Sequence, residues 1–166
     1  MGTIRLGIAP MQHRTRNLPH FEGAGRTYFL TFRRHSKVHF DLTDPLCGEI
    51  IVSALHFFHG DRYLLYDYTI MPDHVHMIIK PLKTRAKTNC LSKILHSIKS
   101  WTANQINCHR GARGPVWQEE TYDHIIRDRQ DYETKSRYIW ANPVRAGLTD
   151  DPTDWPWWGH GLQTGE

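Results

Sequence analysis

The sequence predicts an α+β fold: a ferredoxin-like split βαβ antiparallel sheet with helices packed on one face, followed by a C-terminal helix. Three observations support this prediction. Segments with strand-like and helix-like spacing of apolar residues follow one another in the order β-α-β-β-α-β-α. Only Met71, Pro72 and Asp73 separate the two middle strands, which is a hairpin-turn length. The other strands are joined through helices, so both crossover helices can lie on the same face of one sheet.

The first half of the chain supplies three strands and one helix. The segment from Thr27 to Phe32 is rich in aromatic and β-branched residues and is typical of a strand. Asp44 suits the N-cap of a helix and Pro45 its first position, and Gly60 follows the last apolar residue of the helical pattern. The two hairpin strands are expected at residues 62–70 and 74–81.

The second half supplies two helices and one strand. A helix is expected from about Leu91 to Asn107, with Trp101 on its apolar side. Residues 116–126 predict a fourth strand, interrupted by polar residues at 118–120. A last helix is expected from about Gln130 to Ala141, because Pro143 disfavours helical geometry at the residue before it.

Composition indicates one globular domain. The 166 residues are 39% hydrophobic, and we expect a flexible arm at residues 1–24, the domain at 25–148 and a tail at 149–166. No apolar run has the length of a membrane span, and the start lacks the layout of a signal peptide, so a cytoplasmic protein is expected. The three cysteines are widely spaced and expected to be reduced. The net charge of +4 suits a polyanionic partner.

The third strand carries a possible metal site. His74 and His76 stand either side of Val75, so on a strand both imidazoles emerge on one face while Val75 turns into the core. Two imidazoles on one rigid face can hold a divalent cation, although a complete site needs further ligands. The alternative is two ordinary surface histidines, which the spacing alone does not exclude.

The last helix offers groups that could complete such a site. Tyr138 and Asn142 are four residues apart, so they share a helix face. A tyrosine hydroxyl beside a cation is a competent nucleophile for phosphodiesters, and an amide oxygen can be a third metal ligand. Tyr122 and Tyr132 compete with Tyr138 for the role of nucleophile, and a half-buried packing role for Tyr138 also remains open.

Four segments together resemble a known family, the REP-associated tyrosine transposases, which belong to the HUH endonucleases with a single catalytic tyrosine. The resemblance extends from about Gly25 to Trp158. The segments that carry it are residues 71–76 (MPDHVH), 97–103 (SIKSWTA), 122–127 (YDHIIR) and 138–148 (YIWANPVRAGL).

The resemblance implies a role for each matching residue. His74 and His76 would be the metal-binding histidines, Tyr138 the nucleophile and Asn142 a third metal ligand. The implied activity is Mg²⁺- or Mn²⁺-assisted cleavage of single-stranded DNA near hairpin repeats, through a covalent 5′-phosphotyrosine intermediate that a 3′-hydroxyl can later attack to rejoin strands. The protein would act as a monomer or a homodimer.

Basic residues are the expected DNA contacts, because they can neutralise phosphates. The two clustered loops at residues 33–37 and 83–87 are favoured over single positions. Trp101 or Trp117 could stack on a base if exposed. The residues expected to bind DNA are Arg33, Arg34, Lys37, Lys83, Arg85, Lys87 and Lys99.

Two other functions are compatible with the same residues. One is a domesticated protein that binds DNA hairpins with weak or lost cleavage. The other is a metal-dependent hydrolase that uses activated water, with Tyr138 in a structural role. A covalent protein–DNA adduct distinguishes the transposase-like enzyme from both.

Overall fold

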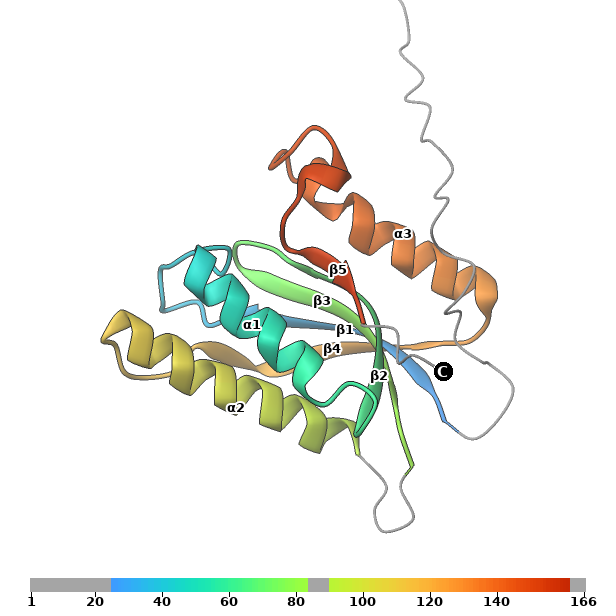
Figure 1. Cartoon of the computed structure of the whole chain (residues 1–166), viewed down its shortest axis with the longest axis horizontal. Helices are drawn as coiled ribbons and strands as arrows, with labels where there is room; N and C mark the ends of the chain where they lie inside the picture. Colours follow the sequence, from blue (N-terminus) through green and yellow to red (C-terminus); the bar gives the residue numbers. More distant parts are fainter. Residues whose placement is uncertain (1–24, 84–89, 162–166) are drawn as a thin grey trace, which may run out of the picture.

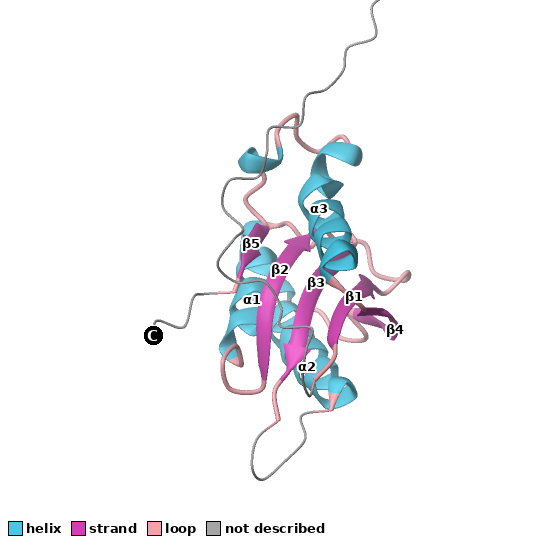
Figure 2. Ribbon diagram, turned by 90° about the vertical axis from the view of Figure 1, so that its right-hand side faces the viewer, coloured by secondary structure: helices cyan, strands magenta, loops and turns pink. Residues whose placement is uncertain are grey.

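A five-stranded antiparallel sheet forms the centre of the protein, with the strands in the order β4-β1-β3-β2-β5. The structure is a computed structural model that describes residues 25–83 and 90–161. Helices α1 and α2 cover one face of the sheet and α3 lies on the other (Figures 1 and 2). The strands are β1 (Thr27–Arg34), β2 (Tyr63–Ile70), β3 (His74–Pro81), β4 (Trp117–Ile126) and β5 (Trp158–His160). The helices are α1 (Pro45–Phe57), α2 (Leu91–Arg110), α3 (Arg129–Arg145) and the short 3-10 helix η1 (Pro152–Asp154).

The strand order confirms the predicted fold class. β2 and β3 form the hairpin, and β3 lies between β1 and β2, as a split βαβ arrangement requires. In the β1–β3 register, Thr31 lies opposite His76 and Arg33 lies opposite His74. The register therefore brings the side chains of two distant segments onto one face of the sheet.

Alternation along the strands divides the core in two. Val75, Met77 and Ile79 of β3 are fully buried in the larger cluster, beneath α1 and α2. Ile78 points the other way, into a smaller cluster under α3 that includes Phe29 and Ile139. His74 and His76 share the face of Ile78, so the histidine pair lies on the α3 side.

The helix that carries Tyr138 is longer than predicted. The Asp128 side chain caps α3 by accepting a hydrogen bond from the Asp131 amide at 2.9 Å. The helix passes through Pro143 and ends at Arg145, rather than at Ala141. Proline lacks an amide hydrogen and its ring crowds the carbonyl four residues earlier, but Pro143 lies in the last turn, so these losses fall near the end of the helix. Tyr138 and Asn142 are therefore both helical.

One other packing prediction is wrong. Trp101 is 46% exposed, because the buried side of α2 is centred on other residues and Trp101 falls at its edge. The residues buried along α2 are Ile94, Leu95, Ile98, Thr102 and Ile106.

The sequence predicted no element after Gly147, yet the chain continues into η1 and β5. β5 pairs with β2. It has only three residues, including Gly159, which is too short for an alternating pattern to predict a strand. Trp155 donates from its indole Nε1 to the carbonyl of Ile70 at 3.1 Å. Gly48 of α1 leaves the space that the Trp157 ring fills. The segment from η1 to β5 is thus packed against the sheet and α1.

Two predictions concern features beyond this core. The predicted arm at residues 1–24 lies outside the described residues. Within the described part of the chain, none of the helices has both the length and the apolar character that a membrane span requires.

Candidate active site

The two histidines of β3 converge on one point. His74 Nε2 and His76 Nε2 are 3.1 Å apart, and their ring centroids are 4.6 Å apart. Two donors that each lie about 2.1 Å from one cation, at right angles, would be about 3.0 Å apart. The separation of the two nitrogens therefore fits a shared divalent cation.

Each imidazole is held in place by a hydrogen bond at Nδ1, the ring nitrogen that does not face the second histidine. His74 Nδ1 lies 2.6 Å from an Asp73 carboxylate oxygen, so Nδ1–H donates to Asp73. His76 Nδ1 lies 2.7 Å from the hydroxyl oxygen of Thr31 on β1. Donation from Nδ1 to Thr31 leaves the lone pair on Nε2, which is the tautomer that a metal ligand needs.

The surroundings also keep both imidazoles neutral. The pKa of His76 is lowered to about 3, chiefly by burial and also by the nearby His74 and Arg33. Burial lowers the pKa of His74 as well, although the Asp73 carboxylate opposes this shift. A neutral imidazole is the form that binds a cation.

The two histidines do not form a complete metal site with other side chains of the described residues. Among the described residues, no group of three His, Cys, Asp or Glu side chains is placed to hold a metal ion. Further coordination at the pair would thus need an amide oxygen, a water molecule or a substrate oxygen.

Tyr138 lies beside this pair in a pocket of about 640 Å³. Its ring centroid is 5.3 Å from that of His76 and 6.0 Å from that of Phe29, and its side chain is 37% exposed. The Arg145 guanidinium lies 5.1 Å from the centre of the Tyr138 ring. The pocket is lined by Phe29, Thr31, Arg33, His76, Gln118, Glu120, Tyr122, Lys135 and Tyr138.

The other candidates lie in different places. Asn142 is half-buried one turn after Tyr138 in α3, and it is not among the residues that line the pocket. Tyr122 lines the pocket from β4, opposite Thr31. Tyr132 is buried and donates to Asp67 at 2.9 Å, so its hydroxyl points away from the pocket into the sheet. Proximity to the histidines therefore favours Tyr138 over the two competing tyrosines, and the role of Asn142 stays a prediction.

The basic residues expected to bind DNA are divided between the two faces of the sheet. Arg33 lines the pocket and lies 3.4 Å from the Asp73 carboxylate. Arg34 is half-buried on the other face, with its guanidinium over the Phe40 ring.

The lysines in this set differ in their exposure and in their contacts with the rest of the protein. Lys99 donates to the Glu119 carbonyl at 2.9 Å, and burial lowers its pKa. Lys37 and Lys83 are exposed. Arg85 and Lys87 lie outside the described residues.

Trp117 does not present a surface for stacking on a base. It is buried and donates from Nε1 to Thr102 Oγ1 at 2.8 Å. Trp101, in contrast, is exposed.

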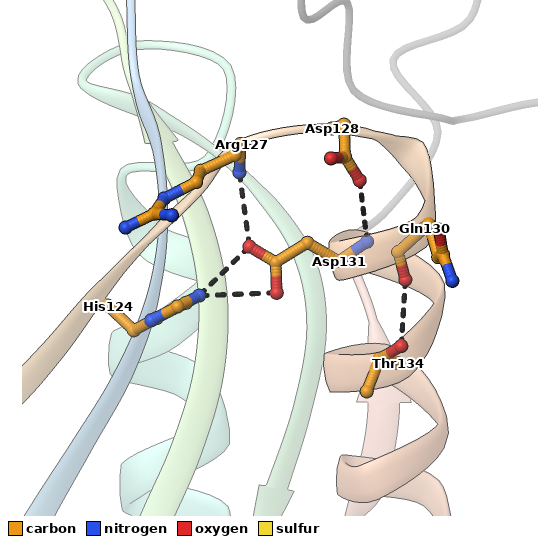
Figure 3. Close-up of a pocket in the computed structure, with 6 residues that line it drawn as sticks. All are labelled: His124, Arg127, Asp128, Gln130, Asp131 and Thr134. Atoms are coloured by element: carbon orange, nitrogen blue, oxygen red, sulfur yellow. Dashed lines mark hydrogen bonds and ion pairs between the residues drawn. The ribbon is translucent and has the colours of Figure 1, made fainter.

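A second pocket, of about 410 Å³, lies at the start of α3 (Figure 3). The Asp131 carboxylate lines it and accepts hydrogen bonds from His124 Nε2 at 2.9 Å and from the Arg127 amide at 3.1 Å. Figure 3 shows the Arg127 guanidinium directed away from that carboxylate. These contacts join the end of β4 to the first turn of α3, and they fix where the helix begins.

Comparison with known proteins decides the family. The family described as "Transposase IS200 like" matches residues 42–142, which is more than half of the chain and includes both histidines, Tyr138 and Asn142. The chain belongs to the IS200-like transposase family.

Relatives within this family bear the name suggested by the motifs. A Haemophilus influenzae protein named as a candidate REP-associated tyrosine transposase is 28% identical over 96 residues, which are 53% of each chain. The REP-associated tyrosine transposase of Escherichia coli K12 is 39% identical over 41 residues, which are 25% of each chain. The resemblance stated from the motifs is confirmed, while the matched segments span only about half of the first relative and a quarter of the second.

Solved structures support the fold. A REP-associated tyrosine transposase bound to a REP hairpin has a TM-score of 0.65 at 22% identity, covering 87% of this chain and 82% of the other. A Deinococcus radiodurans protein described as a transposase candidate has a TM-score of 0.50 at 15% identity, covering 74% of this chain and 95% of the other. At these identities the likeness establishes a shared architecture.

Proposed function

We propose that this IS200-like transposase cleaves and rejoins single-stranded DNA near hairpin repeats through a covalent bond to Tyr138. The observation that carries the proposal is the position of Tyr138, with its ring 5.3 Å from the ligand-ready His76 in a pocket open to solvent. A nucleophile beside a cation site is the arrangement that phosphodiester transfer needs.

The proposed reaction needs no external energy source, because each phosphodiester bond that breaks is replaced by another. The Tyr138 hydroxyl oxygen attacks phosphorus and gives its proton to water, the Oη–P bond forms and the P–O3′ bond breaks. The departing 3′ oxygen takes up a proton and becomes a 3′-hydroxyl, while the phosphate stays on the 5′ side as a phosphotyrosine. In the reverse step a 3′-hydroxyl attacks the phosphotyrosine and releases Tyr138.

The residues around Tyr138 have separate tasks. His74 and His76, with Asn142 as a third ligand, would hold Mg²⁺ or Mn²⁺. The bound cation would offset the charge that develops on the phosphate. Asp73 and Thr31 hold the two imidazoles through Nδ1, which would leave both Nε2 atoms free to bind the ion. Phe29 stacks on the His76 ring and meets the Tyr138 ring edge to face, so one aromatic side chain supports both residues.

A relative and the charge of the chain support the proposed class of DNA substrate. The solved relative with the same fold is described as bound to a REP hairpin. The chain carries a net charge of +4, and exposed Lys37 and Lys83 could contact phosphates. We therefore propose hairpin DNA with adjoining single-stranded bases as the substrate.

The test uses single-stranded oligonucleotides with a hairpin stem and randomised flanking bases. The protein is incubated with this pool and Mg²⁺ or Mn²⁺, and covalent adducts are isolated on a denaturing gel and sequenced. We expect an adduct and a free 3′-hydroxyl fragment with the wild-type protein, and neither after EDTA treatment. Binding without any adduct would instead indicate a hairpin-binding protein, and free 5′-phosphate products would indicate hydrolysis by water.

A further inference from the structure

The pocket that holds Tyr138 contains a second cationic side chain, Lys135, to which the mechanism above assigns no task. Lys135 lies one turn before Tyr138 in α3, so the two residues share a helix face. Its side chain is half-buried and lines the pocket with Tyr138 and His76.

Phe29 fixes the position of the Lys135 ammonium group. Lys135 Nζ lies 5.1 Å from the centre of the Phe29 ring, a cation–π contact. The same ring is 4% exposed, stacks on His76 with centroids 5.3 Å apart and meets the edge of Tyr138. The buried Phe29 ring therefore contacts three groups that line the pocket: the Lys135 ammonium group, the proposed metal ligand His76 and the proposed nucleophile Tyr138.

The charge of Lys135 is also available for a ligand. Arg33, the other basic residue that lines the pocket, lies 3.4 Å from Asp73. In the described part of the chain, no carboxylate lies within ion-pair distance of Lys135. Asp131, one turn earlier, interacts electrostatically with Lys135, but its carboxylate accepts its hydrogen bonds from His124 and from the Arg127 amide. Glu120 lines the pocket without pairing with Lys135. A half-buried ammonium group without a direct ion pair can still donate to an anionic substrate.

We propose that Lys135 binds a non-bridging oxygen of the scissile phosphate and offsets the negative charge that builds up as Tyr138 attacks. This role rests on the proposed function. The bonds made and broken are those of the tyrosine transfer, and Lys135 keeps its proton throughout. A preorganised donor aimed at the developing charge accelerates such a step.

The test compares three variants on the oligonucleotide found by adduct selection. Lys135→Met keeps an unbranched apolar stem over Phe29 but removes the charge, Lys135→Arg restores it, and Arg137→Met removes a charge from an exposed position on the same helix. We expect the single-turnover rate of adduct formation to fall on the order of 100-fold in Lys135→Met. Lys135→Arg should recover most of the rate, and Arg137→Met should match the wild type.

A second substrate shows whether Lys135 acts on the phosphate charge. A methylphosphonate at the scissile position replaces one charged oxygen with a methyl group. On this substrate the loss caused by Lys135→Met should shrink to a few-fold, whereas a structural defect would persist undiminished. Equal losses on both substrates, or an unaffected rate on the phosphodiester, would overturn the role of Lys135 alone. No adduct with the wild-type protein would overturn the proposed function itself.

Discussion

At the scale of single residues, the site depends on the groups that hydrogen-bond to Nδ1 of the two imidazoles. His76 lies between two threonines, Thr31 on β1 and Thr69 on β2, which flank it in the sheet register. Only Thr31 contacts the ring, at 2.7 Å from Nδ1, whereas the buried Thr69 hydroxyl has no hydrogen-bond partner in the described structure. The two threonines therefore provide a matched pair for testing how the tautomer is fixed.

Substitution of Thr31 by valine is expected to weaken Mn²⁺ binding by about 10- to 100-fold, because His76 loses the acceptor that fixes its tautomer. Isothermal titration with Mn²⁺ measures the affinity. Thr69→Val makes the same chemical change on the other side of His76 and should leave the affinity unchanged. Equal effects from the two variants would show that Thr31 does not orient the ligand.

The sequence predicts part of this residue-scale picture. The alternation on one strand is enough to place His74 and His76 together, with Val75 in the core. The partnership of His76 with Thr31 depends on the β1–β3 register, which the sequence pattern does not specify. Lys135 depends on the tertiary position of Phe29, since nothing in its spacing distinguishes it from a solvated surface lysine.

At the scale of elements, the helix that carries Tyr138 is anchored by a buried carboxylate. Asp67 of β2 is 1% exposed and accepts hydrogen bonds from Tyr132 of α3 at 2.9 Å and from His160 of β5 at 2.7 Å. One side chain thus links the central hairpin, the proposed catalytic helix and the C-terminal strand. A buried charge is tolerated only when it is hydrogen-bonded in this way.

Removal of the Tyr132 hydroxyl in Tyr132→Phe is expected to lower the free energy of unfolding by about 1.5–3 kcal/mol, because a buried carboxylate loses a donor. Urea denaturation measures the change. Tyr66→Phe is the control, because the Tyr66 ring packs on Tyr132 with centroids 6.0 Å apart. Burial raises the pKa of Tyr66 to about 12, and its hydroxyl makes no hydrogen bond to the described residues. A loss in Tyr66→Phe as large as in Tyr132→Phe would argue against the Asp67 anchor.

The elements themselves follow closely from local patterns, with two informative exceptions. Capping by Asp44 and alternation in the hairpin place α1, β2 and β3 within a residue or two of their observed bounds. The extension of α3 through Pro143 is a tertiary effect, since residue 143 is buried against the core. β5 forms because its residues pair with an open edge of β2, which no local signal shows.

At the scale of the whole molecule, the fold places the proposed site on the α3 face, opposite the face covered by α1 and α2 (Figure 2). Not all of the basic residues expected to bind DNA lie on this face. Arg34 packs over Phe40 and Lys99 donates to β4, while Lys37 and Lys83 stay exposed. The exposed lysines are therefore the better candidates for phosphate contacts.

Affinity for hairpin DNA should fall linearly with the logarithm of salt concentration, because phosphate contacts release counterions. Lys37→Ala and Lys83→Ala should each reduce the magnitude of that slope by about 0.7 if the contact is to a single-stranded phosphate. Fluorescence anisotropy across a salt series measures the slope. Arg129→Ala, whose guanidinium already pairs with Glu133 at 2.8 Å, should leave the slope unchanged. Unaltered slopes in both lysine variants would exclude them from the DNA interface.

The central claim is that Tyr138 is the residue that joins to DNA, and mapping the covalent bond tests it most directly. The adduct formed with Mn²⁺ is digested with protease and nuclease, and mass spectrometry locates the tyrosine that carries the nucleotide. The account predicts a 5′-phosphotyrosine at Tyr138, its loss in Tyr138→Phe with DNA affinity largely retained, and its persistence in Tyr122→Phe. An adduct on Tyr122, or full cleavage by Tyr138→Phe, would contradict it.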